Sequence, residues 1–458
     1  MWLMKPVTLW ICLVLVCLVG VAGTGEIADH VDRARAAQQR GDFVTAAAEW
    51  QALAQAEPNL AEAHSNAGMM LHFAHQYTKA IEAFRQAVRL NPQLVAPHLF
   101  MGIDYYLVSR AADAIRELEA ALKLDSKNAL GRKWLAMASF QAGDFFTAAR
   151  VLNTAIREDH SDPELLFWLS RTYSKVLFVS YEQIRRINPE SDLLRLLRDH
   201  NTPLPDRNRT VKASLESGRA DAVFEMFERA IDQNPSNPEN WFWLGKAAQV
   251  QALKMLDAFL AASPKSYRVH QLQAEHYIAQ GDEASAISEY HKALAMQPDA
   301  VQLHSSIGGI LMSRHEYKEA IIEYDAELRA DPYSLAALER IGTAYAELHE
   351  PDRAEIYLRR ALTINPRSYE ARRAMGKISY ERGDYKNAVS NFLAIVTDAG
   401  AREPSVLYQL SQAYGKLGNE AESRRWRAKF RQELANQRGA AQRRLEKSVT
   451  LEAKSPND

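Results

Sequence analysis

Histidine is the residue type whose spacing in this 458-residue sequence first suggests chemistry. Neutral imidazole is a common metal ligand, and histidines three or four residues apart share one face of a helix. His72 and His75 have that spacing, but no third ligand is evident nearby. Other histidines recur at one position of a repeating frame: His30, His64, His98, His270 and His304. Adjacent packed helices lie about 8–10 Å apart, whereas a ligand must reach within about 2.1 Å of its ion. These histidines therefore predict packing within a repeat, and we expect no metal site.

Motifs for catalysis are missing from the sequence. It has no Gly-rich phosphate loop, no G-x-S-x-G and no H-E-x-x-H. Its two cysteines, Cys12 and Cys17, both fall in the first 25 residues, so a chain without that segment has no thiol nucleophile. A net charge of -1 gives no overall attraction for nucleic acid. We expect neither enzymatic activity nor a cofactor.

The elements that position these side chains follow a period of 34 residues, because Pro58 and Pro92 are 34 apart and Pro298, Pro332 and Pro366 continue the spacing. In eight frames small residues stand at positions 8 and 20 and a large apolar or aromatic residue at position 24, and a ninth frame near Pro404 fits through Leu410, Ser411, Tyr414 and Gly418. The frames begin at Ile27, Ala61, Val95, Ala129, Tyr267, Val301, Leu335, Tyr369 and Pro404.

Each frame reads as a hairpin of two helices. In "TKAIEAFRQAVRL" the apolar residues recur at intervals of three and four, which predicts one buried stripe on a helix. Small residues such as Gly68 and Ala80 let paired helices approach closely, and Phe84 fills the space beside them. The "NP" at 91 and 92 ends the second helix. A single hairpin cannot bury both faces, so consecutive hairpins must stack.

Size, spacing and proline together resemble the tetratricopeptide repeat family, whose pattern is W-x2-L-G-x2-Y, then A-x3-F, then P. The resemblance covers most of residues 27–435. It implies an all-α fold, a right-handed α-solenoid of stacked helix-turn-helix repeats with a concave surface.

The middle of the chain departs from this frame. "PELLFWLS" at 163 matches "PENWFWLG" at 238, an offset of 75 that indicates a duplicated block of two hairpins. Each copy then runs to its next proline, which predicts longer or irregular helices there. The expected organisation is a signal peptide or N-terminal anchor at 1–23, four repeats at 27–162, divergent duplicated repeats at 163–266 with a loop near 199–210, five repeats and a basic capping helix at 267–436, and a basic helical extension with a disordered tail at 437–458.

The resemblance also implies where partners bind, since positions 2, 5, 9, 12 and 13 of the first helix line the groove in members that hold extended peptides. These positions hold Met69, Phe73, Ile103, Tyr106, Leu107, Met137, Phe140, Arg373 and Lys377. An exposed apolar row would mark a partner site. Alternatively, curvature or the N-terminal helix covers these side chains.

The two ends of the sequence bear on location. Lys5 followed by an uncharged run from Pro6 to Gly25 resembles a secretory signal peptide, with an uncleaved membrane anchor as the alternative. Residues 420–447 hold nine Arg or Lys against four Glu, which fits a solvated cap or a surface for anionic lipid or an acidic partner.

We therefore expect an exported, periplasmic or secreted, non-catalytic scaffold that holds protein or peptide segments in a concave groove. The alternatives are a membrane-associated envelope assembly component and an accessory subunit of an enzyme complex. We expect no nucleic-acid partner, and the sequence does not indicate an oligomeric state.

Overall fold

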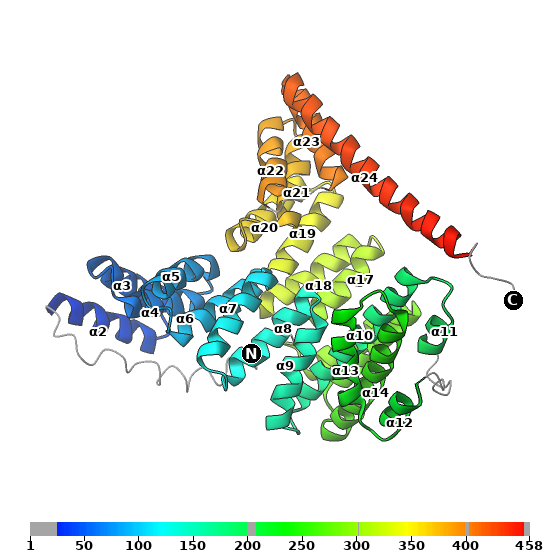
Figure 1. Cartoon of the computed structure of the whole chain (residues 1–458). Coiled ribbons are helices and arrows are strands. Elements are labelled where there is room, and N and C mark those ends of the chain that lie inside the picture. Colours follow the sequence, from blue (N-terminus) through cyan, green and yellow to red (C-terminus); the bar gives the residue numbers. More distant parts are fainter. Residues whose placement is uncertain (1–24, 199–207, 301, 399–402, 453–458) are drawn as a thin grey trace. The chain divides into compact units, whose positions relative to one another are not determined.

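The computed structural model describes residues 25–198, 208–300, 302–398 and 403–452, and every regular element in these ranges is a helix (Figure 1). The helices are α2 (Gly25–Gln39), α3 (Phe43–Ala56), α4 (Ala61–Phe73), α5 (Tyr77–Leu90), α6 (Val95–Leu107), α7 (Ala111–Leu124), α8 (Ala129–Ala142), α9 (Phe145–Glu158), α10 (Pro163–Ile187), α11 (Asp192–Arg198), α12 (Arg209–Glu216), α13 (Ala220–Gln233), α14 (Pro238–Ala262), α15 (Tyr267–Gln280), α16 (Glu283–Met296), α17 (Leu303–Ser313), α18 (Tyr317–Ala330), α19 (Leu335–Glu347), α20 (Pro351–Ile364), α21 (Tyr369–Glu381), α22 (Tyr385–Asp398), α23 (Pro404–Lys416) and α24 (Glu420–Glu452). Among these described helices none is long and apolar enough to cross a membrane. The all-α fold of stacked helix-turn-helix repeats is confirmed.

The chain divides into two compact units. Unit 1 comprises residues 1–126 and 267–436, and unit 2 comprises 127–266 and 437–458. The hairpin of α8 and α9 thus groups with the duplicated block, whereas the sequence grouped it with the three hairpins before it. The reason is that α9 packs on α10, and α10 is the helix that joins the duplicated copies. The expected N-terminal segment at 1–23 lies outside the described residues, as do most of the loop near 199–210 and the last six residues of the tail.

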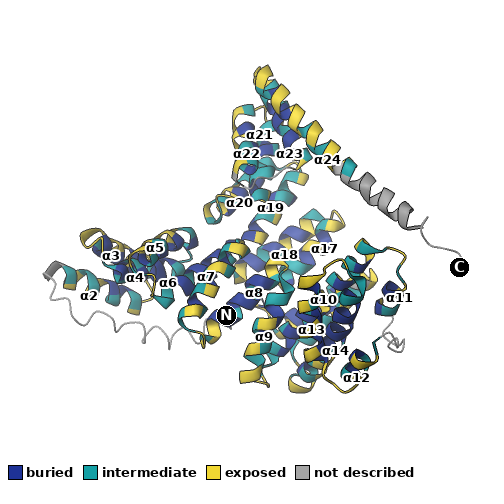
Figure 2. Cartoon of the chain, viewed as in Figure 1, coloured by how far each residue is buried: buried dark blue, intermediate teal, exposed yellow. Residues whose placement is uncertain are grey.

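In unit 1 each 34-residue frame forms one hairpin, and neighbouring hairpins stack through contacts such as those of α3 with α4 and α18 with α19. Where position 8 is glycine, close helix approach depends on it. A Cβ added to Gly68 would lie 2.6 Å from the ring of Phe84, and one added to Gly376 would lie 2.5 Å from the ring of Phe392. Both rings are fully buried, and Figure 2 shows buried residues along the packed sides of these helices.

The turn inside each hairpin places position 15 in the left-handed region. Five turns use glycine there: Gly41, Gly143, Gly281, Gly383 and Gly418. The others use His75, Ser109, His315 and His349, with φ between 57° and 60°. Left-handed geometry costs a non-glycine residue about 1–2 kcal/mol, so these four turns carry local strain.

Unit 2 contains the two long helices that the sequence predicted. Helices α10 and α14 each have 25 residues and begin 75 residues apart, at Pro163 and Pro238. They run antiparallel, because Phe167 near the start of α10 has its ring 5.7 Å from that of Phe259 near the end of α14. Between these ends the Ser170 hydroxyl donates to the carbonyl oxygen of Ala252 at 2.9 Å. The duplicated copies therefore face each other through equivalent helices.

The last described hairpin is α23 with the start of α24. Trp426 is buried in a cluster that includes Phe392, Leu407 and Leu410, so the first turns of α24 cover the end of the repeat stack. Helix α24 continues to Glu452.

Candidate functional site

The residues expected to bind partners from unit 1 are only partly at the surface. Met69 and Ile103 are buried, because consecutive first helices such as α4 and α6 pack against each other on the side that carries position 9. Phe73 is half-buried, with its ring 5.4 Å from that of Phe43 and 6.1 Å from that of Phe100.

Tyr106 and Leu107 are also half-buried. Burial raises the pKa of Tyr106 against the effect of a hydrogen bond with the Gln302 side chain. In unit 1 the apolar row is therefore largely covered.

In unit 2 the two expected residues, Met137 and Phe140, line a pocket of about 20 Å³. Its walls come from α8, α9 and α10, and Trp168 lines it with its ring 5.5 Å from that of Phe140, edge to face. Arg171 lies over the aromatic wall, with its guanidinium carbon 5.2 Å from the Trp168 ring and 5.6 Å from the Phe140 ring. This volume holds about one water-sized group, which suits the tip of one small apolar side chain.

The equivalent residues in the second copy of the duplicated block are more deeply buried. The residues 75 positions after Phe140 and Trp168 are Leu215 and Trp243, which are 4% and 2% exposed. Trp168 itself is only half-buried. The same tryptophan therefore seals the core in one copy and borders an open pocket in the other, and sequence alone did not single out Trp168 as part of the site.

The two charged residues expected in the C-terminal groove already have partners. The Arg373 guanidinium lies 3.0 Å from a carboxylate oxygen of Glu370, and the Lys377 amine lies 3.0 Å from one of Glu347. Both cations are about two-fifths exposed, so the pairs are screened and easily exchanged for a partner's charges.

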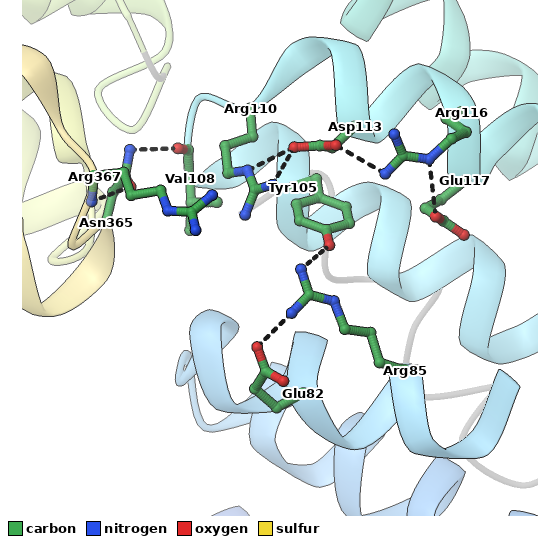
Figure 3. A network of polar contacts seen from close by, with 10 residues as sticks. All are labelled: Glu82, Arg85, Tyr105, Val108, Arg110, Asp113, Arg116, Glu117, Asn365 and Arg367. Atoms are coloured by element: carbon green, nitrogen blue, oxygen red, sulfur yellow. Dashed lines mark hydrogen bonds and ion pairs between the residues drawn. The ribbon is translucent and has the colours of Figure 1, made fainter. Parts of the chain in front are cut away.

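Unit 1 also joins segments that are far apart in sequence (Figure 3). The Asn365 side-chain amide donates to the carbonyl oxygen of Val108 at 3.2 Å, and the Thr78 hydroxyl donates to that of Ile364 at 2.7 Å. Nearby, the His75 and Tyr333 rings stack 4.7 Å apart.

Beside these contacts Arg110 lies over the Tyr105 ring, 4.6 Å away, and pairs with Asp113 (Figure 3). Partial burial acts to raise the pKa of Asp113, but hydrogen bonds from Arg110 and Arg116 outweigh it and hold that pKa below its usual value. Arg110 and Asp113 also border a polar cavity of about 470 Å³, together with Glu339 and Tyr369.

Four of the recurring histidines pair with a glutamate 19 residues later in the same hairpin. The distances from Nδ1 to the carboxylate oxygen are 2.7 Å for His30 and Glu49, 2.9 Å for His98 and Glu117, 2.7 Å for His270 and Glu289, and 2.8 Å for His304 and Glu323. The sequence carries a signal for these pairs, since in these four frames the glutamate recurs 19 residues after the histidine. Within the described ranges no three His, Cys, Asp or Glu side chains are grouped to hold a metal ion.

His72 has a different partner from the one its spacing suggested. Its Nδ1 lies 2.5 Å from Oδ1 of Asp104, a fully buried carboxylate whose Oδ2 has no hydrogen-bond partner. Burial raises the pKa of Asp104 to about 6, against the opposing charge and hydrogen bond of His72. Meanwhile, burial lowers the pKa of His75, and the neighbouring His72 adds to the effect.

Profiles of the tetratricopeptide repeat match residues 61–94, 101–171, 272–334 and 340–404, about half of the chain. The chain belongs to the tetratricopeptide repeat family. Repeats of this kind are interaction scaffolds that present concave surfaces to other proteins. A comparison with curated proteins gives no match.

Solved structures of tetratricopeptide repeat architecture resemble parts of the chain. Two crystal structures of MamA are each 20% identical, with TM-scores of 0.34 and 0.35, and cover 36% of this chain and 91% and 96% of their own. YrrB, described as a repeat protein with an unusual peptide-binding site, is 21% identical with a TM-score of 0.32 and covers 46% of this chain and 93% of its own. PilF of Pseudomonas aeruginosa is 17% identical with a TM-score of 0.35 and covers 46% and 89%. Likeness at this level says nothing about the partner of the present chain.

Proposed function

We propose that this protein is an exported, non-catalytic scaffold that holds an extended segment of a partner protein, and that unit 2 anchors the segment through the pocket of Met137, Phe140 and Trp168. The observation that carries the proposal is the half-buried tryptophan beside that open pocket, because the equivalent Trp243 in the second copy is sealed. Binding energy concentrates where an aromatic side chain lines a small, water-excluding pocket.

The chemistry of the pocket restricts the segment. Its volume of about 20 Å³ admits the end of an alanine, valine or leucine side chain, and a whole aromatic ring would not fit. Lys133, Asp162 and Glu164 stand among the lining residues. These charged side chains give the rim both signs, so polar residues on either side of the anchor find partners there.

The test is capture of partners by matched variants. Phe140→Ser and Trp168→Ser should each reduce capture of the bound protein by at least about tenfold, since anchors of this kind contribute roughly 2 kcal/mol or more. Phe178→Ser is the control, because Phe178 lies on the same helix as Trp168 but is 61% exposed and does not line the pocket. The bound protein is identified by mass spectrometry from the native envelope fraction.

Equal capture by the parent, Phe140→Ser and Trp168→Ser would refute the pocket as the anchor. Circular dichroism of each variant separates this result from misfolding, because a folded variant keeps its helical signal.

Export rests on the sequence of residues 1–25, which carry Lys5 and the uncharged run that follows it. We expect the mature protein to begin after Ala22 or Gly23. N-terminal sequencing of the protein from its native cell tests this, and a protein that starts at Met1 in the cytosol would contradict export.

A further inference from the structure

The exposed side of α24 carries several basic residues. On the repeat helices several arginines have an acid one helical turn away, as in Arg85 with Glu82, Arg353 with Glu350 and Arg359 with Glu355. Such pairs stabilise a helix by about 0.2–0.5 kcal/mol each. They make the surfaces of the repeats electrically mixed.

Three arginines of α24 form a row, and only Arg424 among them has an acid one helical turn away, Glu420. Arg424, Arg427 and Arg431 are exposed and share one face of the helix, at intervals of three and four; we call this row the basic ridge. The residues three and four positions from Arg427 and from Arg431 include no acid, so neither arginine has a carboxylate one turn away. Like charges at this spacing destabilise a helix. An anionic partner that neutralises the ridge would remove this cost.

Packing fixes the direction of the ridge. Trp426 is buried in the cluster at the end of the repeat stack, so the opposite side of the helix, which carries the ridge, faces outward. Arg425 and Lys429 are exposed on a different face of the helix, beside the Trp426 ring, and Arg425 pairs there with Glu422 at 3.0 Å. The sequence of α24 beyond Asn436 adds Arg438, Arg443, Arg444 and Lys447 against two glutamates.

An aromatic pair borders the ridge. Phe430 is half-buried, and its ring lies 5.3 Å from that of Tyr408, which is 44% exposed. Leu417, in the turn before α24, is 47% exposed. At membrane interfaces, arginines contact the lipid phosphates while aromatic and aliphatic side chains insert to the depth of the headgroups. An outward-facing helix can contact a flat lipid surface along its length. An extended peptide would need a groove to make comparable contact.

We propose that the basic ridge binds the surface of a membrane rich in anionic phospholipid, so that the scaffold rests on the bilayer through α24 while its repeats remain free for the partner. Each basic residue near such a surface contributes about a fivefold increase in partitioning. The triple variant Arg424→Gln, Arg427→Gln, Arg431→Gln should therefore bind about a hundredfold more weakly.

The test is sedimentation with vesicles of phosphatidylglycerol mixed with phosphatidylcholine. The protein begins at Gly25, which keeps every described helix and removes the apolar N-terminal run. Binding should be strong at low salt, weak at high salt and absent with phosphatidylcholine alone.

The control replaces three exposed basic residues elsewhere in unit 1, Lys79→Gln, Arg89→Gln and Lys123→Gln, for the same change in net charge. This control should bind like the parent. The proposal would be overturned if both triple variants lost vesicle binding equally. It would also be overturned if binding did not depend on the ridge arginines or on the charge of the lipid. A protein that ignores vesicles but binds poly-glutamate or duplex DNA would also overturn it and assign the ridge to an acidic macromolecule. Capture of the partner by Trp168→Ser is scored separately, so failure of one proposal does not decide the other.

Discussion

Two adjacent glycines in α17 give opposite predictions for the same substitution. A Cβ added to Gly308 would lie 2.8 Å from the Tyr324 ring, which is 2% exposed and has no room to move. One added to Gly309 would meet nothing closer than the Tyr324 hydroxyl at 4.0 Å. Overpacking a core costs about 1–3 kcal/mol, while glycine to alanine inside a helix gains about 0.5–1 kcal/mol. Gly308→Ala should therefore destabilise its hairpin by about 1–2 kcal/mol, and Gly309→Ala should stabilise it by up to about 1 kcal/mol.

The appropriate assay is hydrogen exchange followed on peptides from α17 and α18, because repeat arrays do not always unfold in a single transition. A change of about 1.4 kcal/mol alters the protection of cooperatively exchanging amides about tenfold. Equal protection in the two variants, or greater protection in Gly308→Ala, would refute the idea that position 8 must be small because it faces the ring at position 24.

Three further predictions concern burial, charge and strain. Trp243→Ala should lower the free energy of unfolding by about 3–5 kcal/mol because the Trp243 side chain is buried in the core. Trp168→Ala should lower it clearly less, and urea unfolding of the two variants measures the difference. The pKa of Asp104 is raised from 3.8 to about 6. Its contribution to stability therefore falls by roughly 3 kcal/mol as the pH rises from about 4 to 6. Asp104→Asn should flatten the pH dependence of thermal unfolding over that interval. His349→Gly relieves a left-handed residue with φ of 59° and should raise the melting temperature through a net gain of about 0.5–1 kcal/mol, whereas a lower value would show that the turn is not strained.

Much of unit 1 follows from local rules that a single sequence exposes. The period of 34 residues fixes where each hairpin turns, and Gly68 with Phe84 fixes how closely its helices approach. The burial of individual groove residues could not be predicted from the sequence, because it depends on how successive first helices are offset along one another. Met69 and Ile103 became buried, while Met137, at the same repeat position as both, borders a pocket.

The contacts that sequence reasoning missed are those made between distant segments. The hydrogen bond from Asn365 to Val108 spans 257 residues, and no periodic pattern predicts it. The sequence does limit the candidate partners of His72, since Asp104 is the one acidic residue in α6, the second helix after the one that carries His72. Its full burial, however, is a property of packing alone.

Antiparallel pairing explains why the 34-residue frame fails in the middle of the chain. Two copies of one block can bury their extra apolar surface against each other if equivalent helices meet about a two-fold axis perpendicular to them, which makes them run antiparallel. Helices α10 and α14 run in this way, and Gly245 allows the approach, since a Cβ there would lie 3.0 Å from Cβ of Ser180. Within this pair the two copies differ: Trp243 is buried in the core, while Trp168 is half-buried beside the pocket.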